Sequence, residues 1–319
     1  MIHRILRMSF ALVPAAALAA AADPFPDSIV LSNDMLRAEI VPAWAGRLMS
    51  FGRPSGTNAL WTWPEAARFT VDENGNPVWR NVGGEKTWVG SQGTGWRAFT
   101  GKVWPPPAWF DSMPMDVVES GPTGAVLRTG VHRAGDWAVR LERSFALCGD
   151  RLLVRQRLLP ESVGALGPEA LPDDDRRLWS VVQIPRPDRV LIHLAGEGRN
   201  VRNGAIPVLV PTERPGWAAI DVAGMDDEGK LEADGDRLAA PLADGSGWLV
   251  LSQTAPARHL SAFKTPGRAM VFVSKPDVLP TPYAELEFSA YGPDAEQTVE
   301  FRLADDPFGP DAHECASCL

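Results

Sequence analysis

The clearest structural signal in the chain is Trp137-Ala-Val-Arg-Leu-Glu-Arg-Ser-Phe-Ala-Leu147, the turn Cys148-Gly149-Asp150, and Arg151-Leu-Leu-Val-Arg-Gln-Arg-Leu158. Apolar and polar residues alternate along both runs, and a period of two is typical of β-strands with one buried face. The Gly-Asp pair between the runs favours a tight turn. The stretch therefore predicts an antiparallel hairpin with one face on the core and the other toward water.

Further strand-like runs follow from residue 28 onward, separated by Pro, Gly, Asn and Asp at the spacing of an all-β sandwich. They cover residues 28–31, 36–41, 47–51, 178–184, 189–194, 216–222, 247–253, 269–273, 283–291 and 297–303. No segment of the expected mature chain carries a sustained helical stripe. Residues 161–175 and 226–236 predict loops. Because we find no long linker and no internal repeat, we expect one all-β, mostly antiparallel domain.

The N-terminus has the layout of a secretory signal peptide. Arg4 and Arg7 precede an apolar, alanine-rich stretch that ends at Ala22. This stretch is shorter than the roughly 20 residues of a membrane-spanning helix, although a retained anchor is the alternative. No Cys follows the small residues, so no lipid anchor is expected. The sequence predicts a signal over 1–22, a β domain over 23–305 and a tail over 306–319, in a secreted or periplasmic protein.

The net charge and the hydropathy of the chain argue against two classes of partner, nucleic acids and the membrane interior. The chain carries 31 basic against 40 acidic residues, a net charge of −9, and loss of two N-terminal arginines makes it more negative. Such a surface repels phosphate backbones and anionic headgroups, so we expect no nucleic-acid partner. Since no later apolar run is long enough to span a bilayer, we expect no membrane insertion of the mature chain.

Three cysteines are too few for a disulfide scaffold. Cys315 and Cys318 lie in the predicted tail, where they could join each other or one could join Cys148. A metal site that adds Asp311 and His313 is a weaker alternative, because a single C-x-x-C pair is thin evidence. We expect no metal and no cofactor.

Tryptophan is unusually abundant: the chain has twelve, beside two tyrosines. Most fall in one segment, as Trp44, Trp61, Trp63, Trp79, Trp88, Trp96, Trp104 and Trp109. Much of this segment is Gly- and Pro-rich and predicts surface loops. Indole rings stack on the C–H faces of sugars, and planar polar side chains beside them bind hydroxyl groups. The segment therefore predicts a carbohydrate-binding cleft. The alternative is that the tryptophans hold an irregular segment onto the sandwich.

Acid–base candidates are few. One face of the predicted strand 283–291 carries two carboxyls, two phenols and one hydroxyl, on Tyr283, Glu285, Glu287, Ser289 and Tyr291. A carboxyl buried in a cleft could act as a general base, whereas a solvated strand face is the alternative. Outside the signal and the tail, the possible proton donors are His132, His193 and His259.

The run Gly90-Ser-Gln-Gly-Thr-Gly95 does not match the phosphate-binding loop pattern G-x-x-x-x-G-K-[ST], and no helix is predicted after it. We therefore expect no phosphate loop there. No H-E-x-x-H or G-x-S-x-G motif is present either.

A series of short motifs runs through the chain. It begins with Ile29-Val-Leu-Ser-Asn33, Leu36-Arg-Ala-Glu-Ile-Val-Pro42, Gly46-Arg-Leu-Met-Ser-Phe51 and Gly56-Thr-Asn-Ala-Leu-Trp61. It continues with Gly83-Gly-Glu-Lys-Thr-Trp88, Trp104-Pro-Pro-Pro107, Phe110-Asp111, Trp179-Ser-Val-Val-Gln183, Gly216-Trp217 and Tyr283-Ala-Glu-Leu-Glu287. In this order the motifs resemble the DUF4380 family, within the galactose mutarotase-like (aldose 1-epimerase-like) superfamily.

The resemblance implies a galactose mutarotase-like β-supersandwich with a sugar-sized cleft on one sheet. In aldose epimerases of that superfamily a Glu removes the proton of the anomeric hydroxyl, a His protonates the ring oxygen and an Arg holds hydroxyls. By motif, the resemblance implies Glu285 as the base, with Glu287 as the alternative, and Arg47 as the positioning Arg. The strand motif that carries a His in those enzymes has none here. A displaced His would have to replace it, or the chain epimerises nothing.

These arguments give two sets of candidate site residues. The catalytic candidates are Glu285, Glu287 and His259, and the substrate-binding candidates are Arg47, Asn58, Lys86, Trp88, Gln92, Trp104, Asp111 and Gln183. Three functions fit them. The first is an exported protein that recognises a carbohydrate ligand, and the second is an aldose epimerase or other carbohydrate-modifying enzyme with a Glu base. The third is an envelope protein-interaction domain, because tryptophan is enriched at binding hot spots.

Overall fold

The computed structural model describes residues 25, 27–68, 79, 81–134, 137–161, 176–195, 200–256, 269–278 and 280–309. The predicted signal peptide, His259, most of the expected loop 161–175, and the segment with Cys315 and Cys318 lie outside these residues. Cys148 lies within them and is disulfide-bonded.

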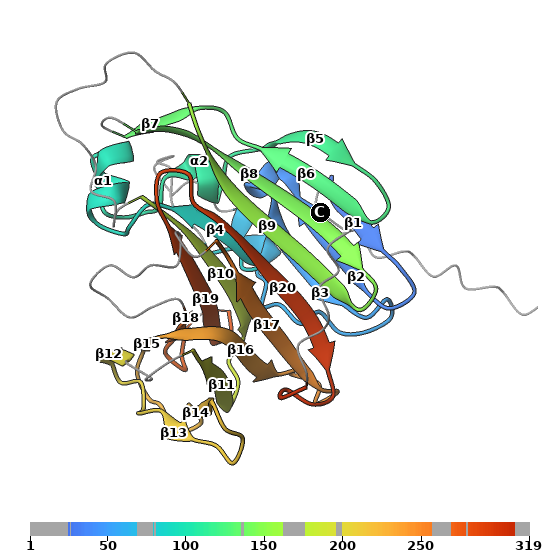
Figure 1. Cartoon of the computed structure of the whole chain (residues 1–319), viewed down its shortest axis with the longest axis vertical. Coiled ribbons are helices and arrows are strands. Elements are labelled where there is room, and N and C mark those ends of the chain that lie inside the picture. The colour runs from blue at the N-terminus through green and yellow to red at the C-terminus, as the bar shows by residue number, and fades with distance from the viewer. Residues whose placement is uncertain are drawn as a thin grey trace, which may run out of the picture.

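Two antiparallel sheets make up most of the described chain and pack against each other (Figure 1). The first has nine strands in the order β1-β2-β3-β4-β10-β19-β18-β15-β12. They are β1 (Ile29–Ser32), β2 (Arg37–Val41), β3 (Arg47–Gly52), β4 (Glu85–Val89), β10 (Arg177–Pro185), β19 (Tyr283–Tyr291), β18 (Ala269–Val273), β15 (Gly229–Ala233) and β12 (Asn200–Gly204).

The second sheet has eleven strands in the order β13-β14-β11-β16-β17-β20-β9-β8-β6-β5, with β7 beside β8. They are β13 (Val210–Pro211), β14 (Trp217–Asp221), β11 (Arg189–Leu194), β16 (Gly235–Pro241), β17 (Trp248–Thr254), β20 (Glu296–Ala304), β9 (Arg151–Pro160), β8 (Trp137–Cys148), β6 (Gly124–Arg128), β5 (Asp116–Ser120) and β7 (His132–Ala134). The prediction of a mostly antiparallel β-sandwich is confirmed.

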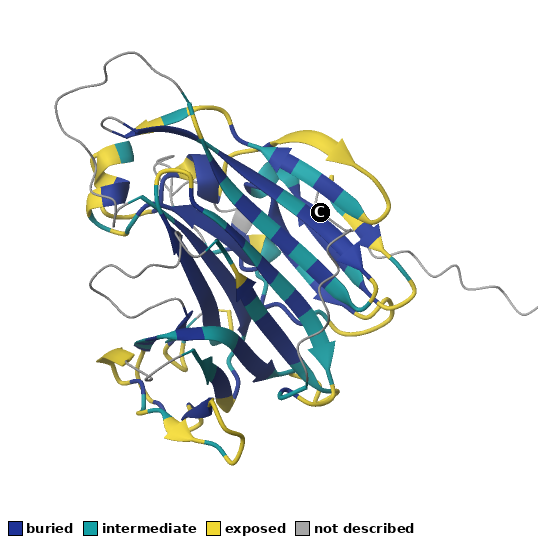
Figure 2. Ribbon diagram, viewed as in Figure 1, coloured by how far each residue is buried: buried dark blue, intermediate teal, exposed yellow. Residues whose placement is uncertain are grey.

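The predicted hairpin is formed by β8 and β9, and Cys148 pairs with Arg151 next to the turn. Along β9 the buried and half-buried residues alternate, as bands across the ribbon show (Figure 2). Arg143 occupies a position on β8 where its neighbours in the alternation, Leu141 and Phe145, are apolar and buried. It is fully buried as well, because its guanidinium donates to a carboxylate oxygen of Glu85 on the facing sheet.

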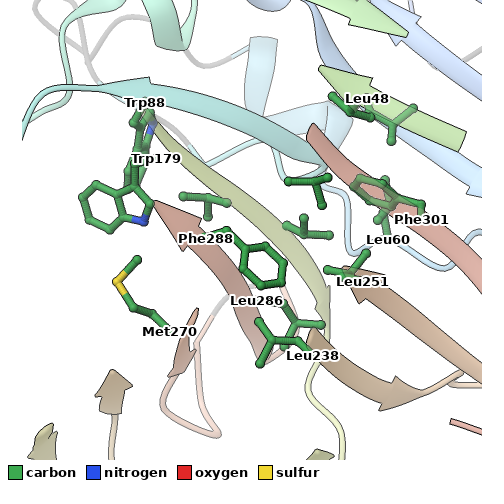
Figure 3. Close-up of a cluster of buried hydrophobic side chains, with 14 of the residues drawn as sticks. Leu48, Leu60, Trp88, Trp179, Leu238, Leu251, Met270, Leu286, Phe288 and Phe301 are labelled. Carbon is green, nitrogen blue, oxygen red and sulfur yellow. The ribbon is translucent and has the colours of Figure 1, made fainter. Parts of the chain in front are cut away.

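The core fills the space between the sheets. Leu286 and Phe288 on β19 lie on the side of their sheet that faces Leu251 and Phe301 of the second sheet (Figure 3). Phe301 also contacts Phe51 of β3, with ring centroids 5.6 Å apart. Burying each such side chain contributes roughly 1.5–3 kcal/mol, so this layer fixes how the sheets sit on each other.

A line of hydrogen-bonded polar groups crosses this apolar core. Gln156 donates to Glu85 at 3.2 Å, Gln297 donates to Gln156 at 2.8 Å, and Gln253 donates to Gln297 at 2.7 Å. The three glutamines come from three adjacent strands of the second sheet, β9, β20 and β17. Buried amides without partners are costly, so this arrangement holds the register of those strands.

The tryptophan-rich segment is more regular than the sequence predicts. It contains β4, the helices α1 (Thr94–Thr100) and α2 (Ala108–Asp111) and the 3-10 turn η2 (Pro64–Arg68), and the 3-10 turn η1 (Pro42–Trp44) lies at its start. The expectation that no helix follows Gly90–Gly95 was wrong, because α1 begins there. A helix of seven residues spans two turns and leaves no periodic stripe to detect.

All ten strand-like runs outside the hairpin are strands, with ends within one residue of the predicted positions. The expected loop at 226–236 is wrong, since β15 and the start of β16 lie there. Other strands were not predicted either, because most are short or lie in polar and Gly-rich sequence. They are β4 to β7, β12, β13 and β16. No helix among the described residues is long and apolar enough to cross a membrane.

Candidate functional site

A cavity of about 550 Å³ lies over the nine-stranded sheet. Its lining consists of Trp79, Lys86, Trp88, Gln92, Trp104, Trp179, Asn203, Gly204, Glu228, Gly229, Lys230, Phe272, Tyr283 and Glu285. The volume falls in the range of small-molecule sites. Trp88 and Trp179 lie on the side of the sheet opposite to the buried Phe288 (Figure 3). The cavity is therefore on the face that is turned away from the second sheet.

Strand register brings the lining residues together. Trp179 is paired with Trp88 across β10 and β4, and Phe272 is paired with Glu285 across β18 and β19. Lys230 of β15 is paired with Phe272. Residues paired directly across antiparallel strands project from the same face. Five strands from distant parts of the chain thus contribute side chains to one surface.

Packed indole rings form one wall. The ring centroids of Trp88 and Trp179 are 5.0 Å apart, and those of Trp79 and Trp104 are 4.8 Å apart. Trp96 of α1 is fully buried and lies 5.2 Å from Trp88. Trp104 is 44% exposed. The wall therefore has a buried inner layer and an outer indole that a ligand can reach.

Asp111 of α2 fixes two of these indoles. Its carboxylate accepts hydrogen bonds from Nε1 of Trp88 and from Nε1 of Trp79, each at 2.8 Å. Arg47 of β3 donates to the same carboxylate at 2.9 Å. Asp111 and Arg47 are each 1% exposed, so this ion pair lies behind the cavity wall and orients it.

Lys86 and Glu285 face each other in the cavity. Nζ of Lys86 lies 3.9 Å from Oε1 of Glu285, which accepts a hydrogen bond from Gln183 at 2.8 Å. Burial lowers the pKa of Lys86 to about 8, and the Glu285 charge opposes this shift. Burial also raises the pKa of Glu285, again against the effect of Lys86. Shifts of this kind bring both groups nearer to neutral pH, where proton transfer is most efficient.

A second lysine of the cavity is paired more tightly. Lys230 donates to Oε2 of Glu287 at 2.7 Å, and Nε1 of Trp179 donates to the same oxygen at 2.6 Å. The Lys230 ammonium lies 4.5 Å from the ring centroid of Trp179. Glu287 is fully buried, so it acts here by holding Trp179 and Lys230 in place.

Neutral polar groups complete the lining. Burial, reinforced by the Glu285 charge, raises the pKa of Tyr283 above its usual value, so its phenol stays protonated. The ring of Tyr283 packs against Trp61, with ring centroids 4.8 Å apart. Gln92 and Asn203 add amide groups. The cavity thus combines aromatic rings with planar hydrogen-bond donors and acceptors.

Five of the sequence-predicted site residues line the cavity: Lys86, Trp88, Gln92, Trp104 and Glu285. Two more, Gln183 and Glu287, are fully buried next to it and contact lining residues. Their side chains support the lining and do not form it.

Three further predicted residues lie elsewhere. The structure places Arg47 and Asp111 in the interior, where they bind each other and the indoles of the wall. Asn58 bonds to main-chain groups of residues 49, 51 and 60 and so shapes the turn after β3. None of these three lines the cavity, because their polar groups are used within the fold. His259 lies outside the described residues.

Several lining residues were not among the predicted set, namely Trp79, Trp179, Asn203, Glu228, Lys230, Phe272 and Tyr283. Trp179 and Tyr283 stand in motifs that the sequence already marks, and a period of two on their strands would have placed them on one face. Lys230 lies in Gly229–Ala233, where polar and apolar residues alternate over only five positions. That run is too short to distinguish from a polar loop.

The described histidines do not line the cavity. His132 stacks on Trp109 with centroids 4.3 Å apart, and burial lowers its pKa. Nδ1 of His193 lies 2.7 Å from Asp236. Within the described residues, no group of three or more His, Cys, Asp or Glu side chains could hold a metal ion.

No family model matches the chain, and no curated protein matches it. Solved structures do match. A provisionally assigned aldose 1-epimerase from Escherichia coli K12 superposes with a TM-score of 0.50 at 13% identity, over 87% of this chain and 98% of that one. A TPR-domain containing protein from Parabacteroides distasonis superposes with a TM-score of 0.50 at 15% identity, over 89% of this chain and 49% of that one.

A second provisionally assigned aldose 1-epimerase, from Klebsiella pneumoniae, has a TM-score of 0.47 at 12% identity, over 86% of this chain and 78% of that one. At such identities the likeness concerns the fold. The chain has an aldose 1-epimerase-like, galactose mutarotase-like β-sandwich fold. Its closer resemblance to the DUF4380 family stays a prediction.

Proposed function

We propose that this chain binds carbohydrate in the cavity over the nine-stranded sheet. The observation that carries the proposal is the pairing of an ordered tryptophan wall with polar groups on the same surface. Trp104 offers a reachable ring in front of the buried indole layer that contains Trp88, whereas Lys86, Glu285 and Tyr283 line the cavity with groups that bind hydroxyls. Aromatic faces flanked by planar polar side chains match the amphipathic surface of a sugar ring.

Ligand-observed NMR tests the proposal directly. Saturation transfer from the protein to hexoses, uronic acids and short oligosaccharides should identify a bound sugar. Trp104→Ala removes a reachable ring from the wall and should weaken binding at least about tenfold, equivalent to 1.4 kcal/mol. Trp248→Ala removes the same side chain from the other sheet and should leave affinity unchanged. No transfer from any sugar in the panel would refute carbohydrate binding at this site.

Sugar ring opening is the second candidate function, and the position of Glu285 favours it. Glu285 lies in the cavity, as the aldose epimerase alternative requires, and Lys86 at 3.9 Å can supply a proton in place of the missing histidine. Accelerated exchange between anomeric signals, abolished by Glu285→Gln, would establish catalysis. Under pure recognition the same variant would change affinity only.

The protein-interaction alternative receives less support from the geometry. Trp61, Trp88, Trp96 and Trp109 are buried, so they do not form an exposed contact patch. Trp104 is the exposed member of the wall. A partner captured by the wild type and lost specifically with Trp104→Ala would revive this alternative.

We also propose that the chain is exported to the periplasm or secreted. The signal-like residues 1–22 and the disulfide at Cys148 both support this, because stable disulfides are typical of oxidising compartments. Expression of the full chain in a Gram-negative host, followed by mass spectrometry of the osmotic-shock fraction, tests it. Export predicts a shortened chain that begins near residue 23. Full-length protein confined to the cytoplasm would contradict it.

A further inference from the structure

The two lysines of the cavity differ in the hydrogen bonds that their ammonium groups make. Lys230 is 24% exposed and donates to Glu287 at 2.7 Å. Lys86 is 1% exposed, and its Nζ has no hydrogen-bond acceptor among the described residues. An ammonium carries three donors, and leaving them unsatisfied in a buried place disfavours the charged form. The Lys86 amine is therefore the one prepared to lose its proton.

The surroundings of Lys86 suit a nucleophile. Burial lowers its pKa to about 8, so a useful fraction is neutral near physiological pH. Its Nζ lies 4.5 Å from the ring centroid of Trp88 and 5.9 Å from that of Trp79, which shields it from water. Lysines desolvated in apolar pockets act as nucleophiles toward carbonyl substrates.

Glu285 supplies the proton transfers that such a reaction needs. Its Oε1 lies 3.9 Å from Nζ of Lys86, so the two groups are neighbours without a direct hydrogen bond between them. Gln183 holds the carboxyl in position through a hydrogen bond of 2.8 Å. Burial raises the pKa of Glu285, which favours a carboxyl that can both give and take a proton.

We propose that Lys86 forms a reversible imine with the open-chain aldehyde of a reducing sugar bound in the cavity, an inference that rests on the proposed carbohydrate function. The neutral Nζ attacks C1, and the carbonyl electron pair moves to O1, which takes a proton from Glu285. The nitrogen then returns a proton to Glu285. Glu285 then protonates the C1 hydroxyl, which leaves as water while the nitrogen lone pair forms the C=N bond, and the resulting iminium nitrogen returns a proton to the Glu285 carboxylate. Amine and aldehyde thus give imine and water, with no change of oxidation state.

Reductive trapping tests the proposal on the full chain. Sodium cyanoborohydride converts an imine to a stable secondary amine, so incubation with D-galactose or D-glucose should add one sugar to Lys86, detected by peptide mass spectrometry. Lys102, exposed after α1, serves as the internal reference, and we expect Lys86 to react at least about tenfold faster. The methyl glycoside binds without an aldehyde, and an excess of it should slow the labelling.

Two variants and one control variant separate chemistry from folding. Glu285→Gln should slow labelling of Lys86 at least about tenfold, and Lys86→Arg should remove the fast site, while Lys102→Arg should leave it unchanged. Far-UV circular dichroism verifies that each variant is folded. If Lys86→Arg is unfolded, the rates of Lys86 and Lys102 in the wild type still decide the matter.

The outcomes distinguish this proposal from the one on which it rests. Sugar binding by saturation transfer, with Lys86 labelled no faster than Lys102, overturns the imine and leaves recognition standing. Glycolaldehyde is a small aldehyde probe that needs no sugar site. Its fast reaction at Lys86, without sugar binding or sugar labelling, would show a reactive amine and overturn both the sugar imine and the proposed function.

Discussion

The Asp111 carboxylate is shared between the indoles of Trp88 and Trp79 and the guanidinium of Arg47, in a place that water does not reach. Asp111→Asn keeps the size of the side chain but removes its charge and replaces an acceptor with a donor. Arg47 would then be a buried charge without its counterion. Breaking a buried pair in this way costs about 3–5 kcal/mol. We expect urea denaturation to show a loss of this size in the free energy of unfolding.

The matched control for this variant is Asp116→Asn on the exposed strand β5. It makes the same chemical change on the surface and should leave the urea midpoint unchanged. Equal midpoints for wild type and Asp111→Asn would show that the ion pair behind the wall contributes nothing to stability. They would also remove the reason for assigning Asp111 a structural role.

Lys86 gives folding stability a pH dependence of definite sign. Its pKa is lowered from 10.5 to about 8 by burial, so between these pH values the unfolded chain holds a proton that the folded chain has released. The free energy of unfolding therefore rises with pH across this window, by up to about 3 kcal/mol from this group. This contribution to the free energy of unfolding is absent below pH 8 and complete above pH 10.5.

Lys86→Met removes this titration and retains much of the side-chain volume. The difference in unfolding free energy between wild type and Lys86→Met should shift in favour of the wild type as pH rises from 7 to 10.5. Urea denaturation at several pH values measures it, and other titrating groups cancel in the difference. A difference that stays flat would mean that Lys86 keeps its ordinary pKa in the folded chain.

Individual residues were predictable where side-chain type and segment sufficed. Lys86, Trp88 and Gln92 stand in the tryptophan-rich segment, and the sequence could assign them to a cleft. The same reasoning could not separate them from Asp111, because a polar residue among aromatics fits a ligand contact and a buried brace equally well. Bonding within the fold decides between the two roles, because the Asp111 carboxylate is taken up by Arg47 and by the indoles. Arg47 lies 64 residues away, so the role of Asp111 depends on how β3 packs against α2.

At the scale of elements, the Glu85–Arg143 pair joins β4 of one sheet to β8 of the other, across 58 residues of sequence. Both side chains are fully buried. Burial raises the pKa of Glu85, and the Arg143 guanidinium opposes this shift. We expect Arg143→Met and Glu85→Leu each to lower the free energy of unfolding by about 3–5 kcal/mol, because each leaves a buried charge unpaired.

The double variant should cost much less than the two single losses combined, since no unpaired charge remains. Urea denaturation of the four proteins gives the coupling energy as a double-mutant cycle. Additive losses would mean that the two groups act independently and that the sheets are joined by apolar packing alone. A control cycle on the partly exposed Arg155–Glu296 pair should show a coupling of only a few tenths of a kcal/mol.

Strands with a clear apolar pattern were predictable, and several in polar or Gly-rich sequence were not. β8, β9 and β19 alternate over nine or more residues, so their period is visible in the sequence. β15 has five residues and follows a polar, Gly-containing stretch, where local preference favours a loop. It is a strand because β12 and β18 flank it, and that pairing is a tertiary effect. Lys230 was missed with it.

At the scale of the whole molecule, many local strand patterns in the sequence agree in predicting the sandwich. No local pattern predicts the cavity. Most of its lining comes from β4, β10, β19, β18, β15 and β12, which span the chain from residue 85 to residue 291, and the rest comes from loops. The order of these strands in the sheet differs from their order in the sequence. Composition could predict an aromatic cleft, but the order of the strands determines that Lys86 meets Glu285.

A ligand that joins so many strands should stabilise the entire fold. At a sugar concentration one hundred times the Kd, binding to the folded state adds about 2.7 kcal/mol, which should raise the Tm by roughly 5 °C. Trp104→Ala, with a tenfold weaker Kd, should show about half of that shift at the same concentration. Trp248 lines a different groove, on the second sheet, so the Trp248→Ala variant should keep the full shift in Tm. A sugar that raises the Tm of the wild type and Trp104→Ala equally, but not that of Trp248→Ala, would place the binding site on the second sheet.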